Sequence, residues 1–95
     1  MDAFNSLLEV VATLRAPGGC PWDRQQTHES IIPHLIEEAY EVVDALRNGK
    51  EKELVDELGD LLLQVLLHAQ IASEEGRFDI QKVIENLHTK LVRRH

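Results

Sequence analysis

Nine acidic residues lie within one quarter of this 95-residue chain. They fall between positions 37 and 60, where only three basic residues occur, so this stretch carries a net charge of −6 out of a total of −7. The nine are Glu37, Glu38, Glu41, Asp44, Glu51, Glu53, Asp56, Glu57 and Asp60. Like charges this close repel one another, and a bound cation would offset that repulsion. The concentration therefore indicates either a cation site or a solvated acidic face.

Five of these acids have the spacing of residues that share a helix face. On an α-helix, residues three and four positions apart are separated by about 60° and about 40° around the axis. Glu37, Glu38 and Glu41 can therefore face one point, and Glu57 and Asp60 repeat the three-residue spacing further along the chain. The pattern predicts two helices that each present a group of carboxylates.

A short turn joins the two acidic groups. The Asn-Gly pair at positions 48–49 is typical of a helix end. Helices joined by so short a turn lie antiparallel, which brings residues equally distant from the turn to similar heights. Converging carboxylates with no Cys or His partner suit a hard ion, Mg²⁺ with Mn²⁺ as a substitute. Gly59 supports such a site: glycine inside a helix costs about 1 kcal/mol relative to alanine, and close helix approach or room for a ligand would explain it.

Two other interpretations of the acids remain open. A solvated acidic face is the better description of Asp44, Glu51 and Glu53, although the basic residues that usually alternate with acids on such a face are missing here. A di-iron site would need Glu-x-x-His motifs on two helices. The chain has one, from Glu85 to His88, in a segment that carries none of the other acids. A divalent cation site is therefore the favoured prediction.

Apolar residues recur at helical spacing in four segments. These are 2–15, 30–48, 51–75 and 79–95, separated by turns and by one long irregular stretch at 17–26. Ser30 is the expected N-cap of the second helix, with an extra turn from Thr27 compatible with the sequence. The third helix is apolar on nearly every side over 61–72, which is typical of a helix at the centre of a bundle or in a subunit interface. We expect a small all-α antiparallel four-helix bundle, a single domain over 1–95, that completes its core by dimerisation.

The composition excludes several classes of protein. Acidic residues outnumber basic ones 17 to 10, which disfavours a nucleic-acid-binding domain and docking on an anionic membrane. The longest apolar run is too short to span a bilayer. A single cysteine, Cys20, cannot form an internal disulfide and is expected to act as a small buried apolar residue. We expect a cytoplasmic protein with no nucleic-acid or membrane partner.

The sequence resembles the MazG-type nucleoside triphosphate pyrophosphohydrolases over nearly its whole length. The matching motifs are Gly19-Cys20-Pro21-Trp22-Asp23 with Gln26-Thr27, Glu37-Glu38-Ala39-Tyr40-Glu41, Glu57-Leu58-Gly59-Asp60-Leu61-Leu62, Glu75-Gly76-Arg77-Phe78 and Lys90-Leu91-Val92-Arg93-Arg94-His95. The acidic motifs are common to the wider all-α pyrophosphohydrolase superfamily, whereas the first and last motifs point to the MazG type.

The resemblance implies an all-α enzyme that dimerises, requires Mg²⁺ and hydrolyses NTP or dNTP to nucleoside monophosphate and pyrophosphate. It also implies broad base tolerance and a role in clearing non-standard nucleotides or lowering nucleotide pools. Family members usually continue beyond the Arg-Arg-His motif and often carry a second, similar domain. This chain is therefore expected to be a short form or the N-terminal half of a longer protein.

Roles can be assigned to individual residues as a hypothesis. Glu38, Glu41, Glu57 and Asp60 would hold one or two Mg²⁺, which polarise the α-phosphorus for attack by water, while Glu37 would be a further ligand or the catalytic base. The proposed substrate-binding residues are Trp22, Arg24, Lys90, Arg93 and Arg94.

Each of the substrate-binding assignments has a structural alternative. Trp22 would stack on the base or close a pocket, or else anchor its loop in the core. The basic residues at the chain end would bind phosphates or complement the dipole of the last helix. The histidines, His28, His34, His68, His88 and His95, share no metal-binding spacing and are expected to be structural.

Three other functions remain in view. Phosphoribosyl-ATP pyrophosphohydrolases and pyrimidine-specific dNTPases have a similar acidic core with a different pocket. A non-catalytic helical interaction module would use its acids only for solubility.

Overall fold

The computed structural model describes residues 2–94, and most of these residues are helical. The helices are α1 (Ala3–Arg15), α2 (Pro21–Gln25), α3 (Ile32–Asn48), α4 (Glu51–Glu74) and α5 (Ile80–Arg94). No strand occurs among the described residues. The expected all-α class is confirmed, and the helix boundaries of α1, α3 and α4 lie within about two residues of those expected.

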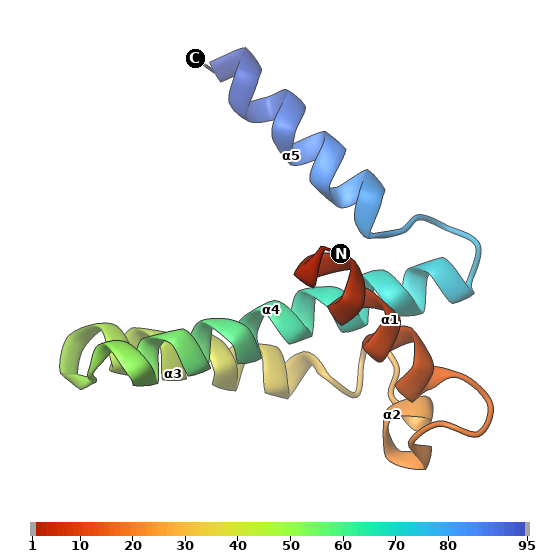
Figure 1. Cartoon of the computed structure of the whole chain (residues 1–95), viewed down its shortest axis with the longest axis horizontal. Coiled ribbons are helices and arrows are strands. Elements are labelled where there is room, and N and C mark those ends of the chain that lie inside the picture. The colour runs from red at the N-terminus through yellow and green to blue at the C-terminus, as the bar shows by residue number, and fades with distance from the viewer. Residues whose placement is uncertain (1, 95) are drawn as a thin grey trace.

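The helical hairpin of α3 and α4 is the longest feature of the molecule (Figure 1). The two helices lie side by side and antiparallel, joined by Gly49 and Lys50. Glycine is required at this turn because a Cβ on Gly49 would lie 2.9 Å from the carbonyl oxygen of Ala45. This turn fixes how far each acid on α3 lies from the acids on α4.

The hydrophobic core lies where α1 crosses the second half of α4 (Figure 1). Its buried members are Val11, Ile31, Leu66, Leu67 and Ile71. All six buried residues of α4 fall between positions 64 and 72, within the segment expected to be apolar on nearly every side. The first half of α4, which carries the acids, has no buried residue among those described.

The start of α3 differs from the expected one. Ser30 does not cap the helix, because Ile31 occupies the N-cap position and is 1% exposed. Ser30 instead closes a turn with Thr27: the backbone N–H of Thr27 donates to Ser30 Oγ at 2.8 Å, and the N–H of Ser30 donates to Thr27 Oγ1 at 3.1 Å. The apolar side chain of Ile31 gains more from the core than a polar cap would gain at that position.

Two features depart from a closed four-helix bundle. The stretch 17–26, expected to be irregular, contains the one-turn helix α2, which begins at Pro21. Helix α5 leaves the end of α4 and projects away from the hairpin (Figure 1), and it has no buried residue. Ile80 packs against the core, but the rest of the apolar stripe of α5, Val83, Ile84, Leu87 and Leu91, is exposed.

No described helix is both long enough and apolar enough to cross a membrane.

Candidate functional site

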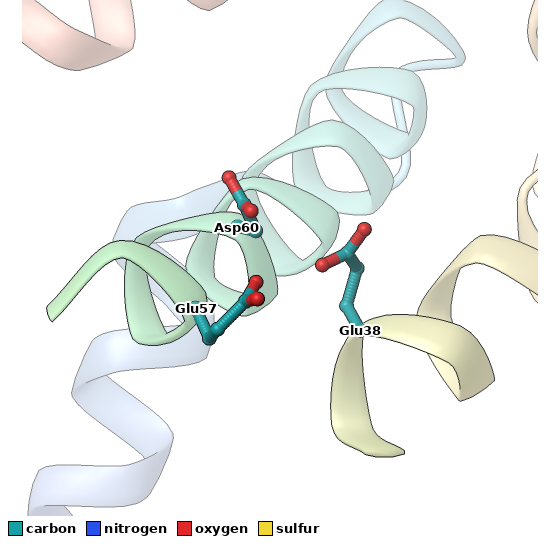
Figure 2. A group of neighbouring side chains, drawn as sticks. All are labelled: Glu38, Glu57 and Asp60. Atoms are coloured by element: carbon teal, nitrogen blue, oxygen red, sulfur yellow. The ribbon is translucent and has the colours of Figure 1, made fainter. Parts of the chain in front are cut away.

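Three carboxylates from two helices meet beside the hairpin. Glu38 projects from α3 toward Glu57 and Asp60 on α4 (Figure 2). One oxygen from each of the three lies within 4.8 Å of the others. This is the only group of three or more such residues with metal-binding geometry in the described part of the chain.

Local helix geometry explains this convergence. Glu57 and Asp60 are three positions apart on α4, so their side chains leave the same face of the helix. Glu38 lies on the neighbouring antiparallel helix at a matching distance from the Gly49 turn. The convergence expected from spacing is therefore present for these three acids.

The electrostatics of the group disfavour three free negative charges. Partial burial and then the charge of Asp60 raise the pKa of Glu38 above its ordinary value. Partial burial and a hydrogen bond with Asp60 raise the pKa of Glu57 in the same way. Glu38 and Glu57 thus favour a bound proton or cation more than free side chains would. An all-oxygen group of this charge suits a hard divalent cation such as Mg²⁺ or Mn²⁺.

Two further predicted acids lie at the edge of this group. Glu41 is exposed and does not belong to the set of three, although its charge contributes to the raised pKa of both Glu38 and Glu57. Glu37 is exposed, and its charge contributes to the raised pKa of Glu38. Glu37 and Glu41 therefore influence the group of three carboxylates through their negative charges.

Gly59 faces open space between Glu57 and Asp60 along α4. A Cβ at this position would meet nothing within 4 Å. Because no atom of the described chain lies against that position, of the two reasons expected for this glycine, only room for a ligand fits the single chain.

Trp22 lies on α2 and is 56% exposed, so it does not anchor its loop in the core. The edge of its ring meets His34 in the first turn of α3, with centroids 6.1 Å apart and planes at 68°. His34 precedes Glu38 by one helical turn. Arg24, on the same short helix as Trp22, is exposed.

The basic residues at the chain end are not brought to the acids within one chain. Lys90, Arg93 and Arg94 are exposed on α5, which packs only against α4 among the described helices. The end of α5 points away from the hairpin (Figure 1). His95, the last residue of the predicted motif, lies outside the described residues.

Some contacts were not anticipated from the sequence. Arg15 joins three helices through its guanidinium group, and His28 pairs with His68. In the sequence, Arg15 could not be distinguished from a basic residue that only complements the dipole of α1. His28 and His68 are 40 positions apart, so no local spacing indicated their contact. Cys20 is half-buried and precedes α2 as its N-cap residue, so its expected burial is only partial.

Comparisons with known proteins show which family this chain resembles. Residues 26–95 match the family described as the MazG nucleotide pyrophosphohydrolase domain. The chain is 52% identical to the nucleoside triphosphate pyrophosphohydrolase/pyrophosphatase MazG of Thermotoga maritima, over 97% of this chain and 36% of that protein. It is 47% identical to the nucleoside triphosphate pyrophosphohydrolase of Escherichia coli K12, over 100% of this chain and 36% of that protein.

A third relative is the uncharacterized protein YabN of Bacillus subtilis, 48% identical over 97% of this chain and 19% of that protein. The chain thus spans about a third or less of the length of the curated relatives described. The family match nevertheless covers most of the chain and includes both acidic motifs. The chain belongs to the MazG nucleotide pyrophosphohydrolase domain family.

Proposed function

We propose that this chain hydrolyses nucleoside triphosphates, NTP or dNTP, to nucleoside monophosphate and pyrophosphate in a reaction that requires Mg²⁺. The observation that carries the proposal is the convergence of Glu38, Glu57 and Asp60 within 4.8 Å. The names of the relatives from Thermotoga maritima and Escherichia coli support the same reaction class. The activity would serve to clear non-standard nucleotides or to lower nucleotide pools in the cytoplasm.

The acids divide into two roles in this proposal. Glu38, Glu57 and Asp60 would hold the divalent cation, and Glu41 would join them by a change of side-chain rotamer. The cation supplies charge neutralisation and polarisation of the phosphate at which water attacks. Glu37 would accept the proton of that water or serve as an additional ligand.

The substrate would bind on either side of the acids. Trp22 offers an exposed indole for stacking on the base, which tolerates different bases because every base has a π-face. Arg24 lies on the same short helix and would contact a phosphate. Lys90, Arg93 and Arg94 would neutralise the remaining phosphate charge.

The position of α5 supports a homodimer in which one chain supplies cations to the site of the other. The apolar side chains along α5 are exposed: Val83, Ile84, Leu87 and Leu91. A second apolar surface on α3 is formed by Leu35, Ile36, Ala39, Tyr40 and Val43. Exposed apolar side chains gathered on one helix face are typical of an interaction site. Packing against a second copy would bury both surfaces and bring the basic end of α5 to another chain.

A nucleotide panel tests the proposed function. Each NTP, each dNTP, an inosine triphosphate and phosphoribosyl-ATP would be supplied with Mg²⁺, and monophosphate and pyrophosphate would be assayed separately. Equimolar monophosphate and pyrophosphate from several bases are expected. Release of inorganic phosphate would contradict the proposal. Activity confined to pyrimidine dNTPs would instead identify a pyrimidine-specific dNTPase, and activity confined to phosphoribosyl-ATP would identify a phosphoribosyl-ATP pyrophosphohydrolase. No turnover together with no divalent cation binding would favour a non-catalytic interaction module.

A further inference from the structure

Arg15 joins three helices at one point. Its side chain is 6% exposed, although it lies in the last turn of α1. The Nε and one terminal nitrogen donate to the two carboxylate oxygens of Glu74 on α4, each at 2.9 Å. The other terminal nitrogen donates to the backbone carbonyl oxygens of Asp23 at 2.6 Å and Gln26 at 2.9 Å. Four of the five guanidinium protons are used, which is more than capping α1 requires.

These bonds hold a helix that has little else to fix it. Helix α2 is five residues long and none of them is buried. Its start is tied to α1 by backbone bonds from Gly19 to Ala16 at 2.8 Å and from Cys20 to Leu14 at 2.9 Å. Its far end is fixed by Arg15, together with an exposed hydrogen bond between the side chains of Ser30 and Gln26 at 2.8 Å. The buried, charged contact at this end is therefore the one from Arg15.

The position of α2 determines the position of Trp22. Trp22 immediately precedes Asp23, whose carbonyl oxygen accepts from Arg15. The indole edge lies against His34, and Glu38 follows His34 by one turn on α3. A small rotation of α2 would therefore move the indole relative to the three acids.

We infer that Arg15 is a positioning residue for the nucleotide: by bonding the carbonyl oxygens of Asp23 and Gln26, it holds Trp22 beside His34, one helical turn from Glu38. The inference rests on the proposed function and adds a residue that contacts neither metal nor substrate. Because Arg15 acts on the stacking platform and not on the acids, its loss weakens nucleotide binding and leaves cation binding unchanged.

The test uses Arg15→Lys, which keeps the positive charge but removes the planar fork that reaches Glu74 and both carbonyl groups. Trp22 is the only tryptophan in the chain, so intrinsic fluorescence reports on it directly. The variant is expected to show lower tryptophan anisotropy and stronger acrylamide quenching than the wild type. KM for ATP is expected to rise about tenfold with kcat within about twofold, the pattern of lost substrate binding. Arg47→Lys, an exposed arginine in the last turn of α3, is the matched control and should change neither quantity.

Three results would overturn the inference or its basis. A folded Arg15→Lys protein with wild-type quenching and wild-type KM overturns the inference. A loss of kcat and of Mg²⁺ affinity together with the change in KM also overturns it, since that pattern indicates a general structural role.

If circular dichroism shows that Arg15→Lys does not fold, Glu74→Gln replaces it, because the amide can accept only one of the two bonds and should give the same changes at smaller size. A wild-type chain that hydrolyses no nucleotide overturns the proposed function instead, and the quenching comparison still decides whether Arg15 holds Trp22.

Discussion

The Nδ1 atoms of His28 and His68 lie 2.7 Å apart and share one hydrogen bond between the turn before α3 and the second half of α4. A guanidinium nitrogen of Arg77 lies 3.1 Å from Nε2 of His28. Because a guanidinium group can only donate, Nε2 of His28 accepts, and its ring proton is on Nδ1. That proton is therefore donated to Nδ1 of His68. The arrangement requires both rings to be neutral.

This pair predicts that the protein loses stability in weak acid. Burial, and then repulsion from His28 when that ring is protonated, lowers the pKa of His68 below its ordinary value. The unfolded chain therefore binds a proton at higher pH than the folded chain does, and the free energy of unfolding falls as the pH drops through the ordinary histidine range. Glu75, whose carboxylate lies 3.7 Å from Nε2 of His28, and Arg77 are the other charged groups facing the pair.

Urea unfolding at about pH 7.5 and about pH 5.5 measures this loss. The variant His68→Gln should make the free energy of unfolding less dependent on pH, whereas His88→Gln, on exposed α5, should retain the wild-type dependence. An equally steep dependence in His68→Gln would show that other groups cause it.

The crowding of the acids predicts a variant that gains stability as it loses cation binding. The raised pKa of Glu57 means that its charged form is less favourable in the folded state than in the unfolded one. Glu57→Gln should therefore raise the melting temperature of the metal-free protein and abolish the further increase caused by added Mg²⁺. Glu51→Gln, at the start of the same helix, is the control: it removes a charge that the helix dipole favours and should not stabilise. A lower melting temperature for metal-free Glu57→Gln would contradict the repulsion argument.

Gly59 is a second position where a substitution is expected to stabilise the protein and weaken its proposed function. Because a Cβ at this position meets nothing in the single chain, Gly59→Ala should stabilise α4 by about 1 kcal/mol through helix propensity. The added methyl group would fill space beside Glu57 and Asp60, so KM for the triphosphate should rise. Chemical denaturation and steady-state kinetics measure the two effects. A loss of stability would instead indicate that a second subunit packs against Gly59.

The exposed stripe on α5 predicts the effect of an interface charge. Leu87, 51% exposed in the single chain, would be buried in the proposed dimer. Leu87→Glu should therefore convert a dimer to a monomer in sedimentation velocity experiments, because a charge buried without a partner is strongly disfavoured. Thr89→Glu, on a different face of α5, should leave the dimer intact. A wild-type chain that sediments as a monomer would contradict the proposed assembly.

The parts of the fold that could be predicted from sequence are the helices whose apolar pattern repeats several times. Apolar residues at helical spacing identified α1, α3 and α4 with nearly their observed bounds, because each of these helices is long enough for several periods. Helix α2 has a single turn and no apolar period, so nothing distinguished it from a loop. Ser30 matched the usual preference for an N-cap, but the burial of Ile31 shifted the start of α3.

Like the fold, the candidate site could be predicted only where it depends on helical periodicity. Spacing on two helices joined by a short turn was enough to bring Glu38, Glu57 and Asp60 together. The contacts of Arg15 with Asp23, Gln26 and Glu74 could not be predicted, because they depend on how a short helix packs at the end of two longer ones. Helical periodicity predicts faces, whereas such packing is set by individual side chains.

The central claim is that Glu38, Glu57 and Asp60 form a divalent cation site that allows an acidic protein to act on a triphosphate. Calorimetric titration of Mg²⁺ into the wild type and into Asp60→Asn tests it most directly, with Glu9→Gln on α1 as a control that removes one carboxylate far from the site along the chain. Saturable binding in the wild type and in Glu9→Gln, with affinity reduced at least about tenfold in Asp60→Asn, is expected. Wild-type affinity in Asp60→Asn, or no binding in the wild type, would contradict the account.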